Sequence, residues 1–546
     1  MDLENQIRKH ALANAVEHEG KAVVGSVIGK LLAENPSLRE NVKDIQHLVV
    51  RIVSEVNNLS SDEQKAALEK TGYEKVEKKE ERKPLELGRV EKVVVRFAPN
   101  PDGAIHLGNA RPAVLSYEYA KKYKGTFYLR FEDTDPKVKK PEKRYYAWIK
   151  EDLKWLGIRW NKKVLIQSKR LKIYYSYAEK LVALGGTYVC TCGDEWKKLR
   201  DQSIACPCRE LPVKEQQKRW KKMLTNRYKE GHAVLRVKTF LGAANPAVRD
   251  WPAMRIVDKP KHPLVKAHLW PLYNFASAID DHVLEITHIL RGQEHSTNEE
   301  KQKFLYRHFG WVYPKVIILG RFLTPEMVLS KSLIRKGIEE HKFSGWDDPK
   351  LGTLRALKRR GFQPSAIRQL ILDIGPKSND VTIAFENLAA YNKKIVDKTA
   401  DRYFFVPRPK KIKVLNPKIK SVKLHLHPER KKGFRTFRVG DTFYIDAEDF
   451  EKFKGTEIRL IGLYNVMLDD ACTITSTELK NIRKLQWVPE SHIKVDMLTP
   501  QGMVSGYGEP TLKKVKIGNV VQFERVGFVR IEKKTAKKIT AVFGHR

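Results

Sequence analysis

The sequence is poor in cysteine and has no long apolar runs. Five cysteines in 546 residues are too few for a disulfide scaffold. No stretch of about 18 apolar residues occurs, which excludes a membrane-spanning helix. The polar residues 1–6 do not resemble the start of a signal peptide. We therefore expect a cytoplasmic protein that has no membrane partner.

Acidic residues are far outnumbered by basic ones. The chain has 65 Asp and Glu against 104 Lys and Arg, a formal net charge of +39. A basic excess of this size favours a polyanionic partner, most simply nucleic acid, which is bound through its phosphates. The alternative is a general solubility surface, but such surfaces usually balance the two signs.

The patterning predicts four regions, in keeping with a length that is too great for one core. Residues 1–88 read as an N-terminal helical domain that ends in a charged linker at 75–84. Residues 89–345 follow an α/β pattern, interrupted by an insertion at about 186–265. Residues 346–400 are expected to be helical, with a break at Gly361 and Pro364. In residues 401–546 the apolar period switches to two, as at 520–531, which predicts an all-β domain built as barrels.

One stretch near the start of the α/β region has the pattern of an anion site. Val93, Val94 and Val95 predict a buried parallel strand, and a turn rich in Pro, Asn, Asp and Gly leads into a helix over 110–122. Backbone N–H groups at such a helix N-terminus attract phosphate. His106 and Asn109 add side-chain donors, although an H-x-G-N sequence alone also occurs by chance.

Acidic residues follow the next predicted strand, over residues 126–131. Glu132, Asp133 and Asp135 come directly after its last apolar residue. Open α/β sheets bind their ligands at the carboxyl ends of their strands. An ordinary acidic turn is the alternative, but the position after an apolar strand favours a ligand site.

Four of the five cysteines form two close pairs within the insertion. They are Cys190, Cys192, Cys206 and Cys208, and residues 193–205 separate the two pairs. Four thiolates across one loop match a structural zinc site, which would have no open coordination position. Chance clustering and redox thiols are the alternatives. Cys472 stands alone and is expected to be a small buried apolar residue.

Two short segments resemble the signatures of class I aminoacyl-tRNA synthetases. Residues 105–109 (Ile-His-Leu-Gly-Asn) resemble the HIGH signature, and residues 328–332 (Val-Leu-Ser-Lys-Ser) resemble KMSKS. Residues 96–101 and 130–136 are similar to the segments that hold the amino acid in the glutamyl and glutaminyl branch. The likeness extends through residues 346–349 and into the β-rich C-terminus. Nearly the whole chain therefore resembles glutamyl-tRNA synthetases of the archaeal type.

The resemblance implies a Rossmann-like catalytic domain with an inserted acceptor-binding subdomain, a helical stem-contact region and a β-barrel anticodon-binding domain. It implies ATP-dependent activation of glutamate to glutamyl-adenylate with Mg²⁺, followed by transfer to the 3′ end of tRNA(Glu). Charging of tRNA(Gln) as well is left open.

The resemblance assigns roles to individual residues. The catalytic residues it implies are His106, Asn109 and Lys331. The ATP-binding residues it implies are Pro99, Asn100, Gly103, His106, Gly108, Asn109, Ser330, Lys331 and Ser332. The glutamate-binding residues it implies are Arg96, Ala98, Glu132, Tyr273, Asn274 and Arg291. Two positions depart from the family pattern, because Asn109 replaces a histidine and Val328 replaces a lysine.

Two other functions are weighed against this one. Glutaminyl-tRNA synthetases resemble the chain but lack an arginine at the position of Arg291. A desolvated arginine that pairs with the γ-carboxylate of glutamate would be left unpaired by glutamine, a penalty of several kcal/mol. A non-catalytic RNA-binding paralogue is the second alternative, and only the departures at Asn109 and Val328 favour it.

Overall fold

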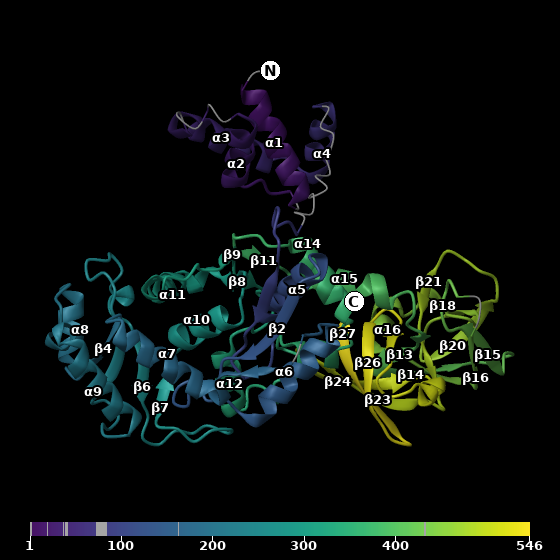
Figure 1. The fold of residues 1–546 in the computed structure, drawn as a ribbon. Coiled ribbons are helices and arrows are strands. Elements are labelled where there is room, and N and C mark those ends of the chain that lie inside the picture. The colour runs from purple at the N-terminus through teal and green to yellow at the C-terminus, as the bar shows by residue number, and fades with distance from the viewer. Residues whose placement is uncertain are drawn as a thin grey trace. The chain divides into compact units, whose positions relative to one another are not determined.

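The computed structural model describes residues 3–18, 20–35, 38, 42–71, 85–161, 163–430 and 433–546. It divides into two compact units, residues 1–81 and residues 82–546, which are coloured along the chain in Figure 1. The linker predicted at 75–84 lies outside the described residues. No helix in the described part of the chain is long and apolar enough to cross a membrane.

The described residues of the first unit form a small helical bundle, as predicted. Its helices are α1 Leu3–Glu17, α2 Val24–Glu34, α3 Val42–Asn57 and α4 Ser61–Lys70. Their apolar faces meet in a core that includes Leu31, Val49 and Ile52. The start of α4 is closed by a capping box between Ser60 and Glu63, which satisfies backbone N–H groups that the helix itself leaves free.

A parallel sheet forms the centre of the second unit. Its strands are β1 Val94–Phe97, β2 Thr126–Phe131, β3 Leu165–Ile166, β8 His288–Gly292 and β9 Lys315–Leu319. β1 pairs with β2, β2 with β3, and β8 with β9, all in parallel. The N–H of Thr287 donates to the carbonyl of Val94 at 2.9 Å and so joins β8 to β1. The resulting order, β3-β2-β1-β8-β9, is that of a nucleotide-binding half of the Rossmann fold.

Two helices pack on this sheet and share its core. They are α5 Leu107–Lys122 and α6 Lys143–Trp155. Val95, Leu115, Leu129 and Ile149 are among the buried side chains that they enclose. The turn between β1 and α5 therefore lies at the carboxyl edge of the sheet, where a ligand is expected.

An antiparallel sheet interrupts the parallel pattern. Its strands run in the order β4-β5-β6-β7, and they are β4 Thr187–Cys190, β5 Val234–Val237, β6 Pro252–Ile256 and β7 Leu269–Pro271. The helices around it are α7 Leu171–Ala183, α8 Glu195–Asp201, α9 Val213–Leu224, α10 Tyr273–Val283 and α11 Ser296–Phe309. Trp220, Trp251 and Trp270 belong to a hydrophobic core that is separate from the core of the parallel sheet.

The segment expected to be helical at 346–400 is helical only in part. Its helices are α13 Leu354–Arg359, α14 Pro364–Ile374 and α15 Phe385–Val396. The helix α12 Lys331–Glu339 precedes the segment. The short strand β10 Phe322–Leu323 pairs in parallel with β11 Val381–Thr382. The break at Gly361 and Pro364 is confirmed. Residues 346–352 are not helical, because the carboxylate of Asp348 accepts the N–H groups of Ser344 and Lys350 at 2.9 and 3.0 Å. Such local bonds compete with a helix.

Strands dominate the C-terminal region, as predicted. The described residues form two seven-stranded sheets and a hairpin, with the orders β12-β25-β26-β27-β23-β24-β13, β21-β18-β19-β20-β14-β17-β22 and β15-β16. The strands are β12 Arg402–Tyr403, β13 Phe405–Pro407, β14 Pro409–Val414, β15 Ser421–His425, β16 Phe434–Arg438, β17 Thr442–Asp446, β18 Glu457–Leu460, β19 Asn465–Met467, β20 Ala471–Ser476, β21 Arg483–Leu485, β22 Val488–Pro489, β23 Ile493–Thr499, β24 Gly502–Gly508, β25 Val520–Phe523, β26 Gly527–Lys534 and β27 Lys538–His545.

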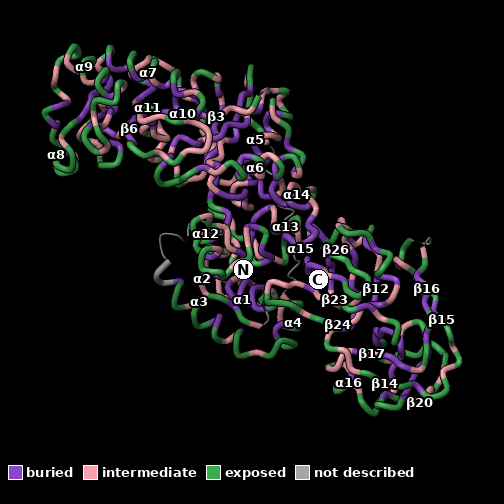
Figure 2. The backbone as a smooth tube through the Cα atoms, turned by 90° about the horizontal axis from the view of Figure 1, so that it is seen from below, coloured by how far each residue is buried: buried purple, intermediate pink, exposed green. Residues whose placement is uncertain are grey.

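Two details of this region differ from the expectation. The region is not purely β, because α16 Ala447–Phe453 begins at Asp446, whose carboxylate accepts the N–H of Glu448. The alternating run 520–531 is not one strand but a hairpin of β25 and β26. Arg525, at φ 62°, and Gly527, at φ 143°, turn the chain there. Exposed and buried residues alternate along β16, which is labelled in Figure 2.

Candidate functional site

The turn between β1 and α5 holds buried polar atoms that have no partner. His106 precedes α5 in an extended conformation, at φ −114°. Among the described residues, the Oδ1 atoms of Asn100 and Asn109 and the Nδ1 of His106 are buried without a hydrogen bond. Each such atom costs roughly 1–3 kcal/mol. A polar ligand at this turn would remove that cost.

His106 is a neutral group in this turn. Burial lowers its pKa to about 3, and the charge of Lys331 contributes in the same direction. An imidazole with so low a pKa is uncharged at physiological pH. It can therefore offer one N–H to a phosphate, but no positive charge.

Lys331 brings a positive charge to the same turn from a distant part of the sequence. It is the first residue of α12, and its Nζ donates to the carbonyl of Asn100 at 3.1 Å and to Asp102 Oδ1 at 2.8 Å. Burial lowers the pKa of Lys331, and Asp102 opposes that shift. The two signature segments predicted from the sequence thus lie together in space.

Small and polar residues shape the turn around these groups. A side chain at Gly103 would lie 2.4 Å from the ring of Trp346, and one at Gly108 would lie 3.0 Å from the ring of His106. Ser330 caps α12 by accepting the N–H of Leu333, and its Oγ lies 3.0 Å from that of Ser332. Larger residues at the two glycines would displace the rings that define this turn.

A buried charge network lies beside the turn, at the ends of β1 and β2. Arg96 donates from Nε and Nη2 to the two carboxylate oxygens of Asp281, at 3.1 and 3.2 Å. Arg130 donates to Asp281 Oδ1 at 2.6 Å and to Glu132 Oε1 at 2.9 Å. Ser277 also donates to Glu132 Oε1, at 2.7 Å. Asp281 therefore positions both Arg96 and Arg130, and the latter holds Glu132.

The loops after β1 and β2 are joined to each other. The N–H of Glu132 donates to the carbonyl of Pro99 at 3.1 Å. Pro99 and the preceding Ala98 therefore lie beside Glu132. This bond brings Pro99, which is predicted to bind ATP, next to Glu132, which is predicted to bind glutamate.

Arg291 differs from Arg96 because most of its donors are free. It lies on β8 and is 5% exposed. Its Nη2 donates to Gln302 Oε1 at 3.1 Å, and the same oxygen accepts the hydroxyl of Tyr313 at 2.7 Å. Its Nε and Nη1 are buried and have no partner among the described residues. A carboxylate is the group whose geometry suits such a guanidinium.

Tyr273 and Asn274 are the first residues of α10, and the charges of Glu132 and Arg291 act on Tyr273. Burial raises the pKa of Tyr273 to about 12, and Glu132 contributes to that shift. Tyr273 therefore keeps its hydroxyl proton and can donate it. Asn274 donates to Asn298 Oδ1 at 3.0 Å and accepts from Gln302 at 3.5 Å. The hydrogen bond from Gln302 thus orients the side chain that accepts a hydrogen bond from Nη2 of Arg291.

The four cysteines of the insertion lie close together. Their Sγ atoms are all within 4.8 Å of one another, with 3.9 Å between Cys190 and Cys206 and 3.6 Å between Cys192 and Cys208. Four sulfurs at about 2.3 Å from one tetrahedral zinc would be about 3.8 Å apart. All four thiols are free of disulfides. The cluster therefore has the dimensions of a zinc site.

Comparison with known proteins decides the family. The model described as "tRNA synthetases class I (E and Q), catalytic domain" matches residues 92–398. The chain belongs to this family. Two models of the anticodon-binding domain of the same family match residues 400–483 and 484–532.

Relatives of this synthetase match it over their full length. The protein named glutamate–tRNA ligase in Pyrococcus furiosus is 51% identical, and that of Sulfurisphaera tokodaii is 43% identical; both matches cover 100% of each chain. The crystal structure of a glutamate tRNA ligase from Elizabethkingia meningosepticum is 24% identical, with a TM-score of 0.42. That match covers 57% of this chain and 70% of the other.

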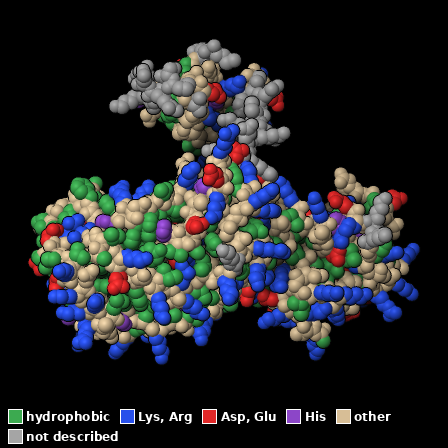
Figure 3. All heavy atoms as spheres, viewed as in Figure 1, with side chains coloured by type: hydrophobic (Ala, Val, Ile, Leu, Met, Phe, Trp, Pro, Cys, Tyr) green, Lys and Arg blue, Asp and Glu red, His purple; other side chains and the backbone are tan. Residues whose placement is uncertain are grey.

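The surface of this synthetase is basic, as its net charge requires. Figure 3 shows Lys and Arg side chains spread over the visible face of residues 85–546, with few acidic ones between them. The sequence therefore predicted the basic net charge, but it did not show which basic and acidic residues form ion pairs inside the fold. A few acidic residues are buried, such as Asp281, which pairs with Arg96.

Several residues of this site were missed by the sequence reasoning. They are the ones that hold other side chains: Arg130, Ser277, Asp281, Gln302 and His295, whose ring is 5.9 Å from that of Tyr273. A signal was present for two of them, because Arg130 interrupts an apolar strand and Asp281 an apolar helix. Charges at such positions are rarely buried unless they are paired.

Proposed function

We propose that the chain is a glutamate–tRNA ligase, which forms glutamyl-adenylate from glutamate and ATP and then charges tRNA. The observation that carries this proposal is the pair of buried, unpartnered donors on Arg291. Full-length relatives that are named glutamate–tRNA ligase support it. A pocket that keeps a desolvated guanidinium unpaired is built for an anion and penalises a neutral amide.

In the first step, the α-carboxylate of glutamate attacks the α-phosphorus of ATP. A P–O bond to the α-phosphate forms, the bond to the β-phosphate oxygen breaks, and pyrophosphate leaves. Positioning and charge stabilisation carry such a reaction. We assign His106 and Asn109 to the phosphates as neutral donors and Lys331 to the charge that develops on pyrophosphate.

The glutamate pocket follows from the charge network. Arg291 pairs with a carboxylate of the substrate through Nε and Nη1, and Tyr273 donates its hydroxyl. Glu132 accepts the ammonium at Oε2, because its hydrogen bonds with Arg130 and Ser277 both end at Oε1. Arg96, held by Asp281, supplies positive potential beside them.

In the second step, a terminal ribose hydroxyl of tRNA attacks the carbonyl carbon of the adenylate. An ester forms and AMP leaves. We assign the anticodon to the C-terminal β sheets, which we propose to be barrels. We assign the acceptor end of the tRNA to the insertion and its stem to the helices at 346–400. The substrate would be tRNA(Glu), with tRNA(Gln) as a second substrate to be tested.

Two metals belong to this proposal. Zn²⁺ fits Cys190, Cys192, Cys206 and Cys208, which would use all its coordination positions and join the end of β4 to the loop at 206–208. The cysteines are the only group of three or more potential ligands in the described part of the chain. Mg²⁺ would therefore arrive on the phosphates of ATP, whose charge it neutralises.

Exchange of pyrophosphate into ATP tests the function. The assay is run with glutamate or glutamine, each with and without tRNA. We expect exchange with glutamate alone, in the presence of tRNA. Exchange with glutamine alone would make the chain a glutaminyl enzyme, and no exchange with either would make it a non-catalytic paralogue.

A further inference from the structure

A chain of hydrogen bonds begins at Arg291 and passes through three side-chain amides. Arg291 donates to Gln302 Oε1 at 3.1 Å, and Gln302 Nε2 donates to Asn274 Oδ1 at 3.5 Å. Asn274 Nδ2 donates to Asn298 Oδ1 at 3.0 Å, and Asn298 Nδ2 lies 3.0 Å from Nδ1 of His295. We call these five residues the amide relay. The relay joins β8 to α10 and α11.

The direction of every bond in the amide relay is fixed at Arg291. A guanidinium only donates, so it must face the oxygen of the Gln302 amide and not the nitrogen. Gln302 then presents its nitrogen to Asn274, and each following amide is turned in the same sense. The last nitrogen, Nδ2 of Asn298, can only donate. Nδ1 of His295 must therefore accept.

His295 consequently carries its proton on Nε2. Burial lowers the pKa of His295 despite the nearby charge of Glu294, so the ring is neutral at physiological pH. A neutral imidazole has one protonated nitrogen and one acceptor, and in His295 the acceptor is Nδ1. The amide relay thus selects one tautomer of this histidine and makes Nε2 a donor.

The ring of His295 belongs to the glutamate pocket. It lies 5.9 Å from the ring of Tyr273, at an angle of 38°. The charges of Arg291, Glu132 and Arg96, which the proposed function assigns to glutamate, all act on it. Nδ1 is bonded to the relay, whereas Nε2 has no hydrogen-bond partner in the described part of the chain. The free donor is therefore the one that the relay has set.

We propose that His295 binds an anionic oxygen of the substrate through Nε2–H, and that Gln302 positions both this donor and Arg291. The oxygen belongs to a carboxylate of glutamate or to the α-phosphate of ATP, an identity that rests on the proposed function. Gln302 is a positioning residue, because it acts through Arg291 and through the amide relay. Donors that are held in place before the substrate arrives lose little conformational freedom when it binds.

Gln302→Glu tests the amide relay with almost no change in side-chain size. A carboxylate accepts from Arg291 as the amide does, but it cannot donate to Asn274. Asn274 must then turn its nitrogen toward the carboxylate, and Asn298 must turn its oxygen toward His295. The substitution should therefore reverse the relay and place a proton on Nδ1 of His295.

The tautomer is read by NMR of the full chain labelled at histidine, without substrate and at pH 8. His295→Phe assigns the signal. We expect the proton on Nε2 in the wild type and on Nδ1 in Gln302→Glu. Asn392→Asp is the control, because Asn392 is a buried amide 2.9 Å from Nε2 of His545 and takes no part in the relay. It should leave His295 unchanged. A wild-type proton on Nδ1, or the same tautomer in Gln302→Glu, would overturn the relay.

The donor itself is tested by the affinity of the full chain for glutamate and for ATP, titrated separately. His295→Phe keeps a ring beside Tyr273, whereas His295→Gln keeps an amide nitrogen that can donate. We expect His295→Phe to weaken at least one of the two ligands about tenfold or more, because a hydrogen bond to a charged group is lost. His295→Gln should retain most of that affinity. Unfolding curves confirm that each variant is folded.

The outcomes separate the two oxygens and the proposed function. Weaker glutamate alone would assign the donor to a carboxylate, and weaker ATP alone would assign it to the phosphate. Unchanged affinity for both ligands in His295→Phe would overturn the binding role of His295, as would an equal loss in His295→Gln. Expected tautomers in a wild type that shows no pyrophosphate exchange would retain the amide relay and refute the proposed function instead.

Discussion

Replacing Arg291 by methionine should have opposite effects on stability and on activity. Methionine has a similar length but no donor, so it removes a buried cation whose Nε and Nη1 are unpaired. Without ligand, we expect the free energy of unfolding to rise by about 1–3 kcal/mol, the cost of leaving such groups unsatisfied. Gln302 keeps the hydroxyl of Tyr313 as its partner.

The same change should remove most of the use of glutamate. Two hydrogen bonds to a carboxylate are worth about 1.5–3 kcal/mol each. Their loss predicts a fall of about 10²–10⁴-fold in kcat/KM for glutamate, at about 1.4 kcal/mol per factor of ten. Arg291→Lys should retain part of the activity, because it keeps the charge but not the planar fork.

A second buried arginine supplies the control. Arg360 is 3% exposed, and its donors bond to the carbonyls of Phe543, Pro349 and Gly544. Arg360→Met should lower stability and leave the KM for glutamate unchanged. Urea unfolding and pyrophosphate exchange measure both properties. If Arg291→Met were destabilised like Arg360→Met, with kcat/KM for glutamate less than tenfold reduced, Arg291 would be a structural residue.

Three further predictions follow from the contacts. Asp281→Asn should raise the KM for glutamate at least tenfold, because Arg96 and Arg130 lose their shared carboxylate. Asp280 accepts hydrogen bonds from Arg170 at 2.9 Å and from Tyr174 at 2.8 Å and lies 4.0 Å from Arg130, so Asp280→Asn should lower the stability by about 1–3 kcal/mol and raise the KM much less; equal KM values of the two variants in steady-state exchange would contradict this. Lys331→Ala should slow activation about 10²–10³-fold with little change in the KM for glutamate, and an unchanged single-turnover rate would contradict the role of Lys331. Elemental analysis should find one zinc per chain, and its removal by a chelator should lower the Tm of the insertion; a chain without stoichiometric metal would refute the zinc site.

The sequence by itself determined the parts of this protein that depend on neighbouring residues. The apolar run before the turn and the two cysteine pairs are local features, and the structure contains both of them. Local rules failed at 346–352, where Asp348 replaces helical hydrogen bonds with its own. They also failed at Arg525, where a positive φ divides one alternating run into two strands.

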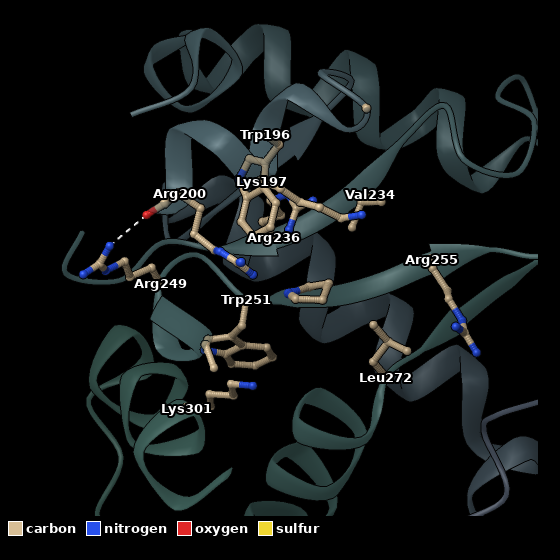
Figure 4. A pocket seen from close by; sticks show the side chains of 13 residues that line it. Trp196, Lys197, Arg200, Val234, Arg236, Arg249, Trp251, Arg255, Leu272 and Lys301 are labelled. Atoms are coloured by element: carbon tan, nitrogen blue, oxygen red, sulfur yellow. Dashed lines mark hydrogen bonds between the residues drawn. The ribbon is translucent and has the colours of Figure 1, made fainter. Parts of the chain in front are cut away.

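Only the tertiary structure decided which polar groups are paired. Arg96 and Arg291 look equivalent in the sequence, yet Arg96 is bound by Asp281, 185 residues away, and Arg291 keeps two donors free. The Nζ of Lys331 donates to Asp102, 229 residues earlier in the chain. The cavity drawn in Figure 4 is lined by residues between positions 193 and 301. Periodicity follows from local backbone geometry, whereas the partner of a buried charge depends on how distant strands and helices pack.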